Sequence, residues 1–171
     1  MTSVPPLLPD EILARVFRLA RADGLSVAFV AGVFALAAAA AGDLPFAIVF
    51  LLGAGAGAIE LHGAALLQAG EARGMNWLVA SQPFLLAVVL VYCALKLAHF
   101  ELTPMPEMFQ ASLEATAKQL GLTVEEYLHM MHRVTVAIVA SVSLVYQCGM
   151  TLYYLRRRKA VALALRSSEA A

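Results

Sequence analysis

Charged side chains are scarce in this sequence: Asp, Glu, Lys and Arg make up 14% of its 171 residues. Soluble domains carry about a quarter of such residues, so the composition excludes an ordinary water-soluble globular protein. The 12 basic and 12 acidic residues give a formal net charge of zero. No overall field therefore attracts nucleic acid or an acidic molecule, and we expect no nucleic-acid partner.

The sequence also lacks the motifs of the common enzyme classes. It contains no Cys-x-x-Cys, no Gly-x-Ser-x-Gly, no phosphate-binding loop and no His-Glu-x-x-His. Its two cysteines, Cys93 and Cys148, are expected at different depths, too far apart for a disulfide, and as fillers of helix contacts. His62 and His99 are likewise expected at different depths, which does not suit one haem. The sequence thus indicates neither an enzymatic activity nor a cofactor.

Long apolar segments dominate what is present. Hydrophobic residues make up 61% of the chain, and its mean hydropathy is +0.79. A helix that crosses a bilayer needs roughly 20 such residues, and four blocks meet that length, at about 25–42, 45–70, 75–100 and 133–155. We therefore predict an all-α fold, an integral membrane four-helix bundle in the lipid bilayer. These blocks and their connections fill residues 1–171, which predicts a single membrane domain.

A charged helical segment precedes the first span. Over residues 10–23 an apolar stripe lies opposite three arginines, which are Arg15, Arg18 and Arg21. This pattern is typical of an amphipathic helix that lies on an anionic membrane surface. The alternative is an extension of the first span beyond the membrane. The small residues at 37–41 also resemble signal peptidase sites, so a cleaved signal peptide is a further alternative for the first block.

The one long polar connection lies between the third and fourth spans. Helical spacing of its apolar residues predicts an extracytoplasmic helical segment over 104–131. Gly121 is expected to end one helix, and Thr123 with Glu126 forms a capping box that begins the next. That helix is expected to continue as the fourth span and to end at Leu155, before the basic run at 156–159. A short, frayed tail would follow.

Basic residues separate to one side of the four predicted spans. Only Lys118 and Arg133 fall on the opposite side, and Lys96 falls within a span. The positive-inside rule then predicts that both termini are cytoplasmic, in the plasma (inner) membrane. The basic residues on the inner side are Arg15, Arg18, Arg21, Arg73, Arg156, Arg157, Arg158, Lys159 and Arg166.

The second span has one face of small residues. Gly53 and Gly57 form the Gly-x-x-x-Gly pattern that lets two membrane helices approach closely, and Gly63 and Ala64 extend this face. Our first interpretation is therefore a protein that acts through helix contacts. It would be a homo-oligomer or a subunit of a larger membrane assembly.

Polar residues also fall at a common level within the predicted spans. A charged side chain at membrane depth costs at least ~2.5–3.5 kcal/mol, so Glu60 is expected to face protein or water. A neutral Glu60 could act as a polar clamp that fixes helix packing. Alternatively, Glu60 is the site of a small proton- or cation-linked transporter or channel, which is our second interpretation. The predicted cluster comprises Glu60, His62, Ser81, Gln82, Ser143 and Gln147.

Two further sets are predicted near the outer surface. Tyr92, Lys96 and His99 share a face of the third span and form an outer polar patch, which either lets the lysine reach the surface or binds an anion. The external segment contributes ligand types that suit a soft copper(I) site or a zinc site. A metal-handling protein or a membrane enzyme is therefore a third interpretation. These candidate metal ligands are Met105, Met108, His129 and His132.

Overall fold

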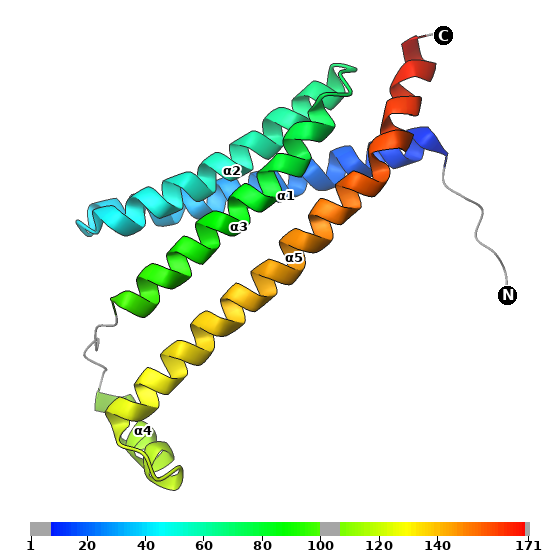
Figure 1. Ribbon diagram of the computed structural model, residues 1–171. Helices are drawn as coiled ribbons and strands as arrows, with labels where there is room; N and C mark the ends of the chain where they lie inside the picture. The colour runs from blue at the N-terminus through cyan, green and yellow to red at the C-terminus, as the bar shows by residue number, and fades with distance from the viewer. Residues whose placement is uncertain (1–7, 100–106, 170–171) are drawn as a thin grey trace, which may run out of the picture.

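Four long apolar helices and one shorter helix make up the part of the chain that the structure describes. The computed structural model describes residues 8–99 and 107–169, in which every regular element is helical. In chain order the helices are α1 (Pro9–Ala40), α2 (Leu44–Gln68), α3 (Gly74–Ala98), α4 (Glu107–Gln119) and α5 (Val124–Glu169) (Figure 1). All except α4 are long and apolar enough to cross a membrane. The prediction of an all-α chain with four potential spans is therefore confirmed.

α1 is one continuous helix of 32 residues. A single helix thus covers the segment expected over 10–23 and the span expected over 25–42. This agrees with the alternative in which the charged segment is an extension of the first span. The apolar stripe faces the bundle, because Val16 and Ala20 are fully buried. These side chains pack against protein, which accounts for the continuous helix. The position of its first turns relative to a bilayer stays a prediction.

Two short turns connect the first three helices. The predicted spans at 45–70 and 75–100 agree with α2 and α3 to within two residues at each end. Gly42 and Gly70 have positive φ values of 77° and 82°, which glycine adopts without a steric penalty. The Asp43 side chain accepts a hydrogen bond from the Phe46 amide at 3.4 Å and so caps the start of α2. The turns therefore fold α1, α2 and α3 back on one another.

The start of α5 has the predicted capping box. The Thr123 amide donates to Glu126 Oε2 at 2.9 Å, and the Glu126 amide donates to Thr123 Oγ1 at 3.2 Å. Gly121, with φ of 69°, ends the preceding turn of α4. Both local predictions are confirmed. The external segment expected over 104–131 comprises α4 and the first turns of α5 in the part that is described.

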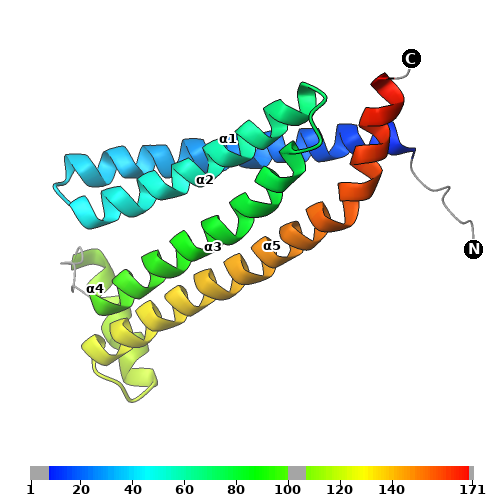
Figure 2. The same ribbon diagram turned by 45° about the horizontal axis from the view of Figure 1, so that its top comes forward.

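The predicted end of the last helix at Leu155 was wrong, whereas the end of the span within it stays a prediction. α5 continues past Leu155 and through the basic run to Glu169. Arginine and lysine are good helix formers, so charge alone does not end the helix. Val161, Ala164 and Leu165 lie on one buried face, and the last turns of α5 lie against the start of α1 (Figures 1 and 2). Burial of this face explains why the tail is helical.

The cysteines occupy different environments. Cys93 of α3 is buried, whereas Cys148 of α5 is exposed, and the two form no disulfide. The expectation that Cys148 fills a contact between helices was therefore wrong for this chain, because its side chain lies on the outer side of α5.

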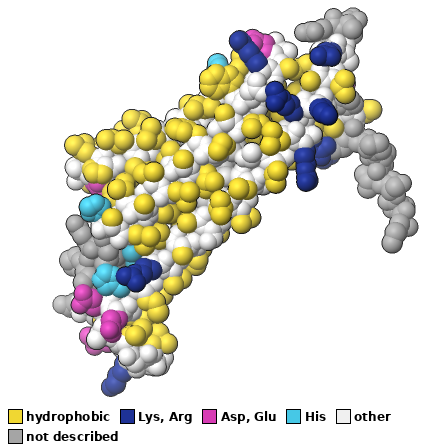
Figure 3. Space-filling model, viewed as in Figure 1, with side chains coloured by type: hydrophobic (Ala, Val, Ile, Leu, Met, Phe, Trp, Pro, Cys, Tyr) yellow, Lys and Arg dark blue, Asp and Glu magenta, His cyan; other side chains and the backbone are white. Residues whose placement is uncertain are grey.

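Charged residues gather at the two ends of the bundle. In the space-filling view, Lys and Arg concentrate near the α2–α3 turn and the end of α5, while Asp and Glu concentrate near α4 (Figure 3). Apolar side chains cover the surface between them. We call the end with the α2–α3 turn the basic end.

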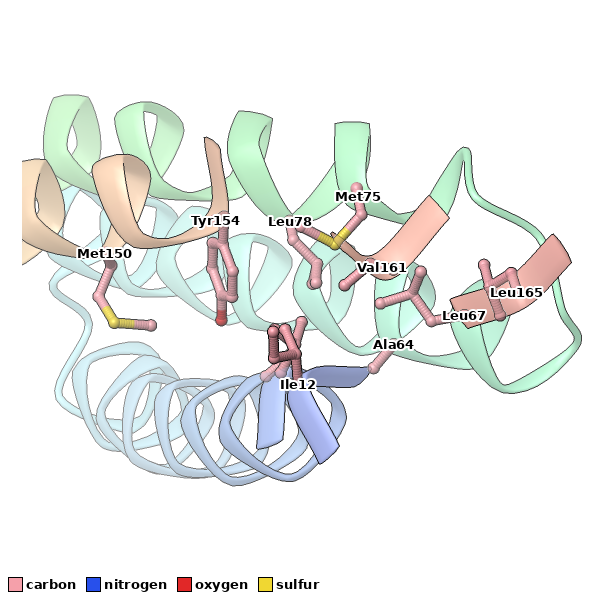
Figure 4. Close-up of a cluster of buried hydrophobic side chains, with 11 residues drawn as sticks. Ile12, Ala64, Leu67, Met75, Leu78, Met150, Tyr154, Val161 and Leu165 are labelled. Carbon is pink, nitrogen blue, oxygen red and sulfur yellow. The ribbon is translucent and has the colours of Figure 1, made fainter. Parts of the chain in front are cut away.

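The largest apolar core lies near the basic end. Four helices contribute to it, and Tyr154, Leu78 and Val161 are fully buried there (Figure 4). Along the bundle α1 packs on α2, α2 on α3 and α3 on α5, and α5 returns to α1. The core thus closes the bundle at this end. Its members are Ile12, Val16, Ala20, Ala64, Leu67, Met75, Leu78, Met150, Tyr154, Val161 and Leu165.

Candidate intramembrane polar site

Glu60 lies at the centre of the polar contacts between the helices. Its side chain on α2 is almost fully buried, with 1% of its surface exposed. Tyr154 of α5 donates a hydrogen bond to Glu60 Oε1 at 2.6 Å, and Gln82 Nε2 of α3 donates to the same oxygen at 3.1 Å. One carboxylate oxygen thus connects three helices. Such links within a membrane each contribute about 0.6–2 kcal/mol to helix association.

A second carboxyl group, from Asp23 of α1, lies within interaction range of Glu60. Asp23 is half-buried, and its Oδ1 accepts a hydrogen bond from Tyr146 of α5 at 3.0 Å. All four potential spans therefore contribute polar groups to one place. We call this set the carboxyl-pair site, and its residues are Asp23, Glu60, Gln82, Tyr146 and Tyr154.

Two glycines bring the carboxyl groups together. A Cβ atom added to Gly57 would lie 2.6 Å from the Ala28 amide nitrogen and 2.7 Å from the Gly24 carbonyl oxygen. Only a residue without a side chain fits where the α1 and α2 backbones cross so closely. Asp23 directly precedes Gly24, and Glu60 lies one turn after Gly57. The close crossing therefore places the two acidic side chains side by side.

The small-residue face of α2 is used within the chain. Added Cβ atoms would lie 3.3 Å from Ala31 Cβ at Gly53, and 3.0 Å from the Gly74 carbonyl oxygen at Gly63. Ala64 is buried in the apolar core. The face predicted as a helix contact thus packs against α1 and α3 of the same chain. Gly53, Gly57 and Gly63 are consequently covered and do not offer this face to a second molecule.

Several buried oxygens at or near the site have no hydrogen-bond donor. They are all acceptors: Asp23 Oδ2, Gln82 Oε1 and Gln147 Oε1. Gln82 and Gln147 have 0% and 5% of their surface exposed. A buried polar atom without a partner costs about 1–3 kcal/mol. The site therefore has more acceptors than donors, a composition suited to a proton or another positively charged group.

The six residues predicted as a cluster lie in three environments. Glu60, Ser81, Gln82 and Gln147 are buried, and Ser81 donates to the Leu78 carbonyl oxygen at 2.9 Å. Ser143 is half-buried, one turn before Gln147 on α5. His62 faces outward, where its ring meets the edge of Trp77 with centroids 5.2 Å apart. Its position about 200° around the helix from Glu60 explains the separation.

Three members of the carboxyl-pair site were not predicted, namely Asp23, Tyr146 and Tyr154. Asp23 follows Arg21 closely and was grouped with the charged segment outside the membrane. The sequence nevertheless contained a signal for Asp23, because both acidic residues lie close to a glycine. Asp23 directly precedes Gly24, and Glu60 follows Gly57 by one helical turn. Tyr154 lies seven residues after Gln147, which places both on one helix face.

The outer polar patch contains aromatic partners. Lys96 Nζ lies 4.3 Å from the centroid of the Phe46 ring, a cation–π contact. Tyr92 packs edge-on against Phe46, with ring centroids 5.8 Å apart, and in a tilted arrangement against Phe50 at 5.6 Å. His99 is exposed at the end of α3. These contacts give Lys96 a role in packing α2 against α3, and anion binding at this patch stays a prediction.

Half of the candidate metal ligands lie within the part that is described. Met105 and the side chain of Met108 fall outside it. His132 Nε2 lies 2.9 Å from the Lys96 carbonyl oxygen, and His129 lines a surface groove together with Glu126 and Met130. Within residues 8–99 and 107–169, no group of three or more His, Cys, Asp or Glu side chains could hold a metal. The copper or zinc hypothesis therefore gains no support from them.

Comparisons with protein-family models, with curated proteins and with solved structures found no match to this chain. Its function is consequently argued from the geometry of the carboxyl-pair site.

Proposed function

We propose that this chain is a small proton-linked transporter or channel in which Asp23 and Glu60 form the ionisable centre. The observation that carries the proposal is the meeting of two carboxyl groups from α1 and α2 inside the bundle. Two negative charges at close range repel strongly where the dielectric constant is low. A proton shared by the pair would remove this repulsion, and its gain or loss would change the charge inside the membrane.

The surrounding hydrogen bonds indicate how a proton could act on the fold. Tyr146 and Tyr154 connect α5 to Asp23 and Glu60, respectively. A carboxylate accepts such bonds more strongly than a neutral carboxyl group does. Transfer of a proton between the two acids would thus strengthen one contact with α5 while weakening the other. We propose that this exchange moves α5 relative to the α1–α2 pair.

The contact-based interpretation has less support than the sequence suggested. Its basis was the Gly53–Gly57 face, and the close approach of α1 at Gly57 occupies that face within one chain. A second chain would have to use another surface. The predicted orientation, with both termini cytoplasmic in the plasma membrane, would place the carboxyl pair in the inner half of the bilayer.

A polar clamp is the second candidate function, and a specific observation favours it. Gln82 and Tyr154 both donate to one oxygen of Glu60, an arrangement that fixes three helices without any titration. Glu60→Gln separates the candidates, because glutamine retains an acceptor oxygen for both donors but cannot hold a transferable proton.

The test is proton flux into liposomes that contain the purified protein, driven by a potassium diffusion potential and followed with an enclosed pH-sensitive dye. We expect a higher proton flux with the wild-type protein than in empty liposomes. Glu60→Gln should lower that flux roughly tenfold or more, because it removes a group that transfers protons. Glu125→Gln, the same change at an exposed position in the first turn of α5, should leave the flux unchanged.

Two results would overturn the proposal. One is a wild-type flux no higher than that of empty liposomes. The other is equal flux in the wild type and Glu60→Gln. Fluorescence of Trp77, the single tryptophan, reports in the same samples whether the variant retains the wild-type fold. A folded Glu60→Gln variant with unchanged flux would leave the polar clamp as the function of Glu60.

A further inference from the structure

A groove on the surface of α5 combines apolar and basic side chains in a fixed order. Gly149 and Leu152 line one part, Tyr153 follows, and Arg156 and Arg157 line the other part. A Cβ atom added to Gly149 would have no neighbour within 4 Å, so the glycine leaves an open hollow on the helix surface. The groove therefore passes from an apolar floor to two guanidinium groups over about two helical turns.

The basic part of the groove is held in place by aromatic rings. The Arg157 guanidinium lies 5.8 Å from the centroid of the Tyr153 ring, and Tyr153 packs edge-on against the buried Tyr154 at 5.7 Å. Arg157 is half-buried as a result. Among the residues that the structure describes, no carboxylate forms an ion pair with Arg156 or Arg157. The two charges are thus positioned toward the groove without an acidic partner.

The position of the groove matches a membrane boundary. It lies at the basic end, where lysine and arginine side chains gather over the end of α5 (Figure 3). Gly149 and Leu152 belong to the apolar part of α5, and the basic run begins at Arg156. Arginine binds phosphate oxygens with two parallel hydrogen bonds, and an open apolar hollow accepts a hydrocarbon chain.

We propose that this groove binds one anionic phospholipid. Arg156 and Arg157 would hold its phosphate, and an acyl chain would lie along Leu152 in the hollow at Gly149. Charge complementarity and the apolar-to-basic order along the helix both point to this ligand. A diffuse attraction between the whole basic run and an anionic bilayer differs from it, since a diffuse attraction does not depend on which arginines are present.

The test compares two double variants that remove the same charge. The protein in mild detergent is mixed with phosphatidylglycerol or phosphatidylcholine, and native mass spectrometry measures the lipid that it retains. We expect wild type to retain one phosphatidylglycerol in preference to phosphatidylcholine. Arg156→Gln with Arg157→Gln should lower this retention roughly tenfold or more, since each basic side chain contributes to headgroup binding. The matched control, Arg158→Gln with Lys159→Gln, changes residues outside the groove and should retain the lipid.

A third variant tests the apolar half of the groove with every charge in place. Gly149→Leu fills the hollow without a clash inside the protein, and we expect it to lower retention of phosphatidylglycerol. Equal losses in the two double variants would overturn the proposal in favour of diffuse attraction. Wild-type retention in Gly149→Leu would also overturn it, as would displacement of the lipid by millimolar inorganic phosphate, which would indicate a soluble anion.

Discussion

The two ends of the bundle differ in how many helices pack together. At the basic end α1, α2, α3 and α5 share one apolar core. At the opposite end α1 packs on α2 and lies apart from α5 (Figures 1 and 2). Large apolar side chains are exposed away from the core. Phe29, Leu36 and Val145 have 73%, 75% and 74% of their surfaces exposed. Packing between helices therefore stabilises the fold mainly at the basic end. The exposed apolar side chains at the opposite end are covered only by whatever surrounds the chain.

The carboxyl-pair site lies where these two regions meet. The Tyr146–Asp23 hydrogen bond connects α5 to α1 beyond the apolar core. Farther along, no hydrogen bond joins these two helices in the part of the chain that is described. In the proposed function, a proton on Asp23 or Glu60 would thus act at the point where α1 and α5 separate. A small local change at this position would then alter the angle between helices that are firmly packed at one end only.

The largest expected effect comes from breaking the close crossing of α1 and α2. Gly57→Val places a branched side chain against backbone atoms that cannot move away, and overpacking of this kind costs about 1–3 kcal/mol or more. We expect the free energy of unfolding in SDS, followed by Trp77 fluorescence, to fall by at least that amount. Gly55→Val, with no neighbour within 4 Å, is the matched control. Similar destabilisation of both variants would show that the crossing is not the cause.

An intermediate effect is expected at the last turns of α5. Leu165 is buried in the core at the basic end, whereas Leu163 has 60% of its surface exposed. Leu165→Ala should lower the free energy of unfolding by about 2 kcal/mol, and Leu163→Ala should change it by less than about 0.5 kcal/mol. The same SDS titration measures both. If Leu165→Ala leaves the free energy of unfolding unchanged, the segment after Leu155 does not contribute to the stability of the core.

Local sequence patterns predicted the helices well because their causes are local. Apolar length marked the potential spans, and the Thr123–Glu126 capping box marked a helix start through neighbouring side chains. The end of α5 was missed for the opposite reason. A basic run favours the membrane boundary, but the helix continues because Val161 and Leu165 reach a core formed with α1. That contact joins residues about 150 positions apart, which periodicity within one helix does not reveal.

The candidate site was predicted in part for a similar reason. Helical periodicity shows which residues share a face, so the burial of Glu60 and Gln82 could be inferred without a structure. It does not show which faces meet. Asp23 joined the site only because Gly24 and Gly57 let α1 and α2 cross closely, and that pairing of glycines from two helices is a tertiary feature.

The smallest effect is expected at the end opposite the core. Lys96→Gln removes the cation–π contact with Phe46, and we expect a loss of about 0.5 kcal/mol in the free energy of unfolding. Lys118→Gln, at an exposed position on α4, should change nothing measurable. Phe46→Leu removes the same contact from the other helix, so combining it with Lys96→Gln should cost less than the sum of the two. If Lys96→Gln instead costs as much as Leu165→Ala, the end opposite the core stabilises the bundle as much as the basic end does, and the contrast between the two ends is wrong.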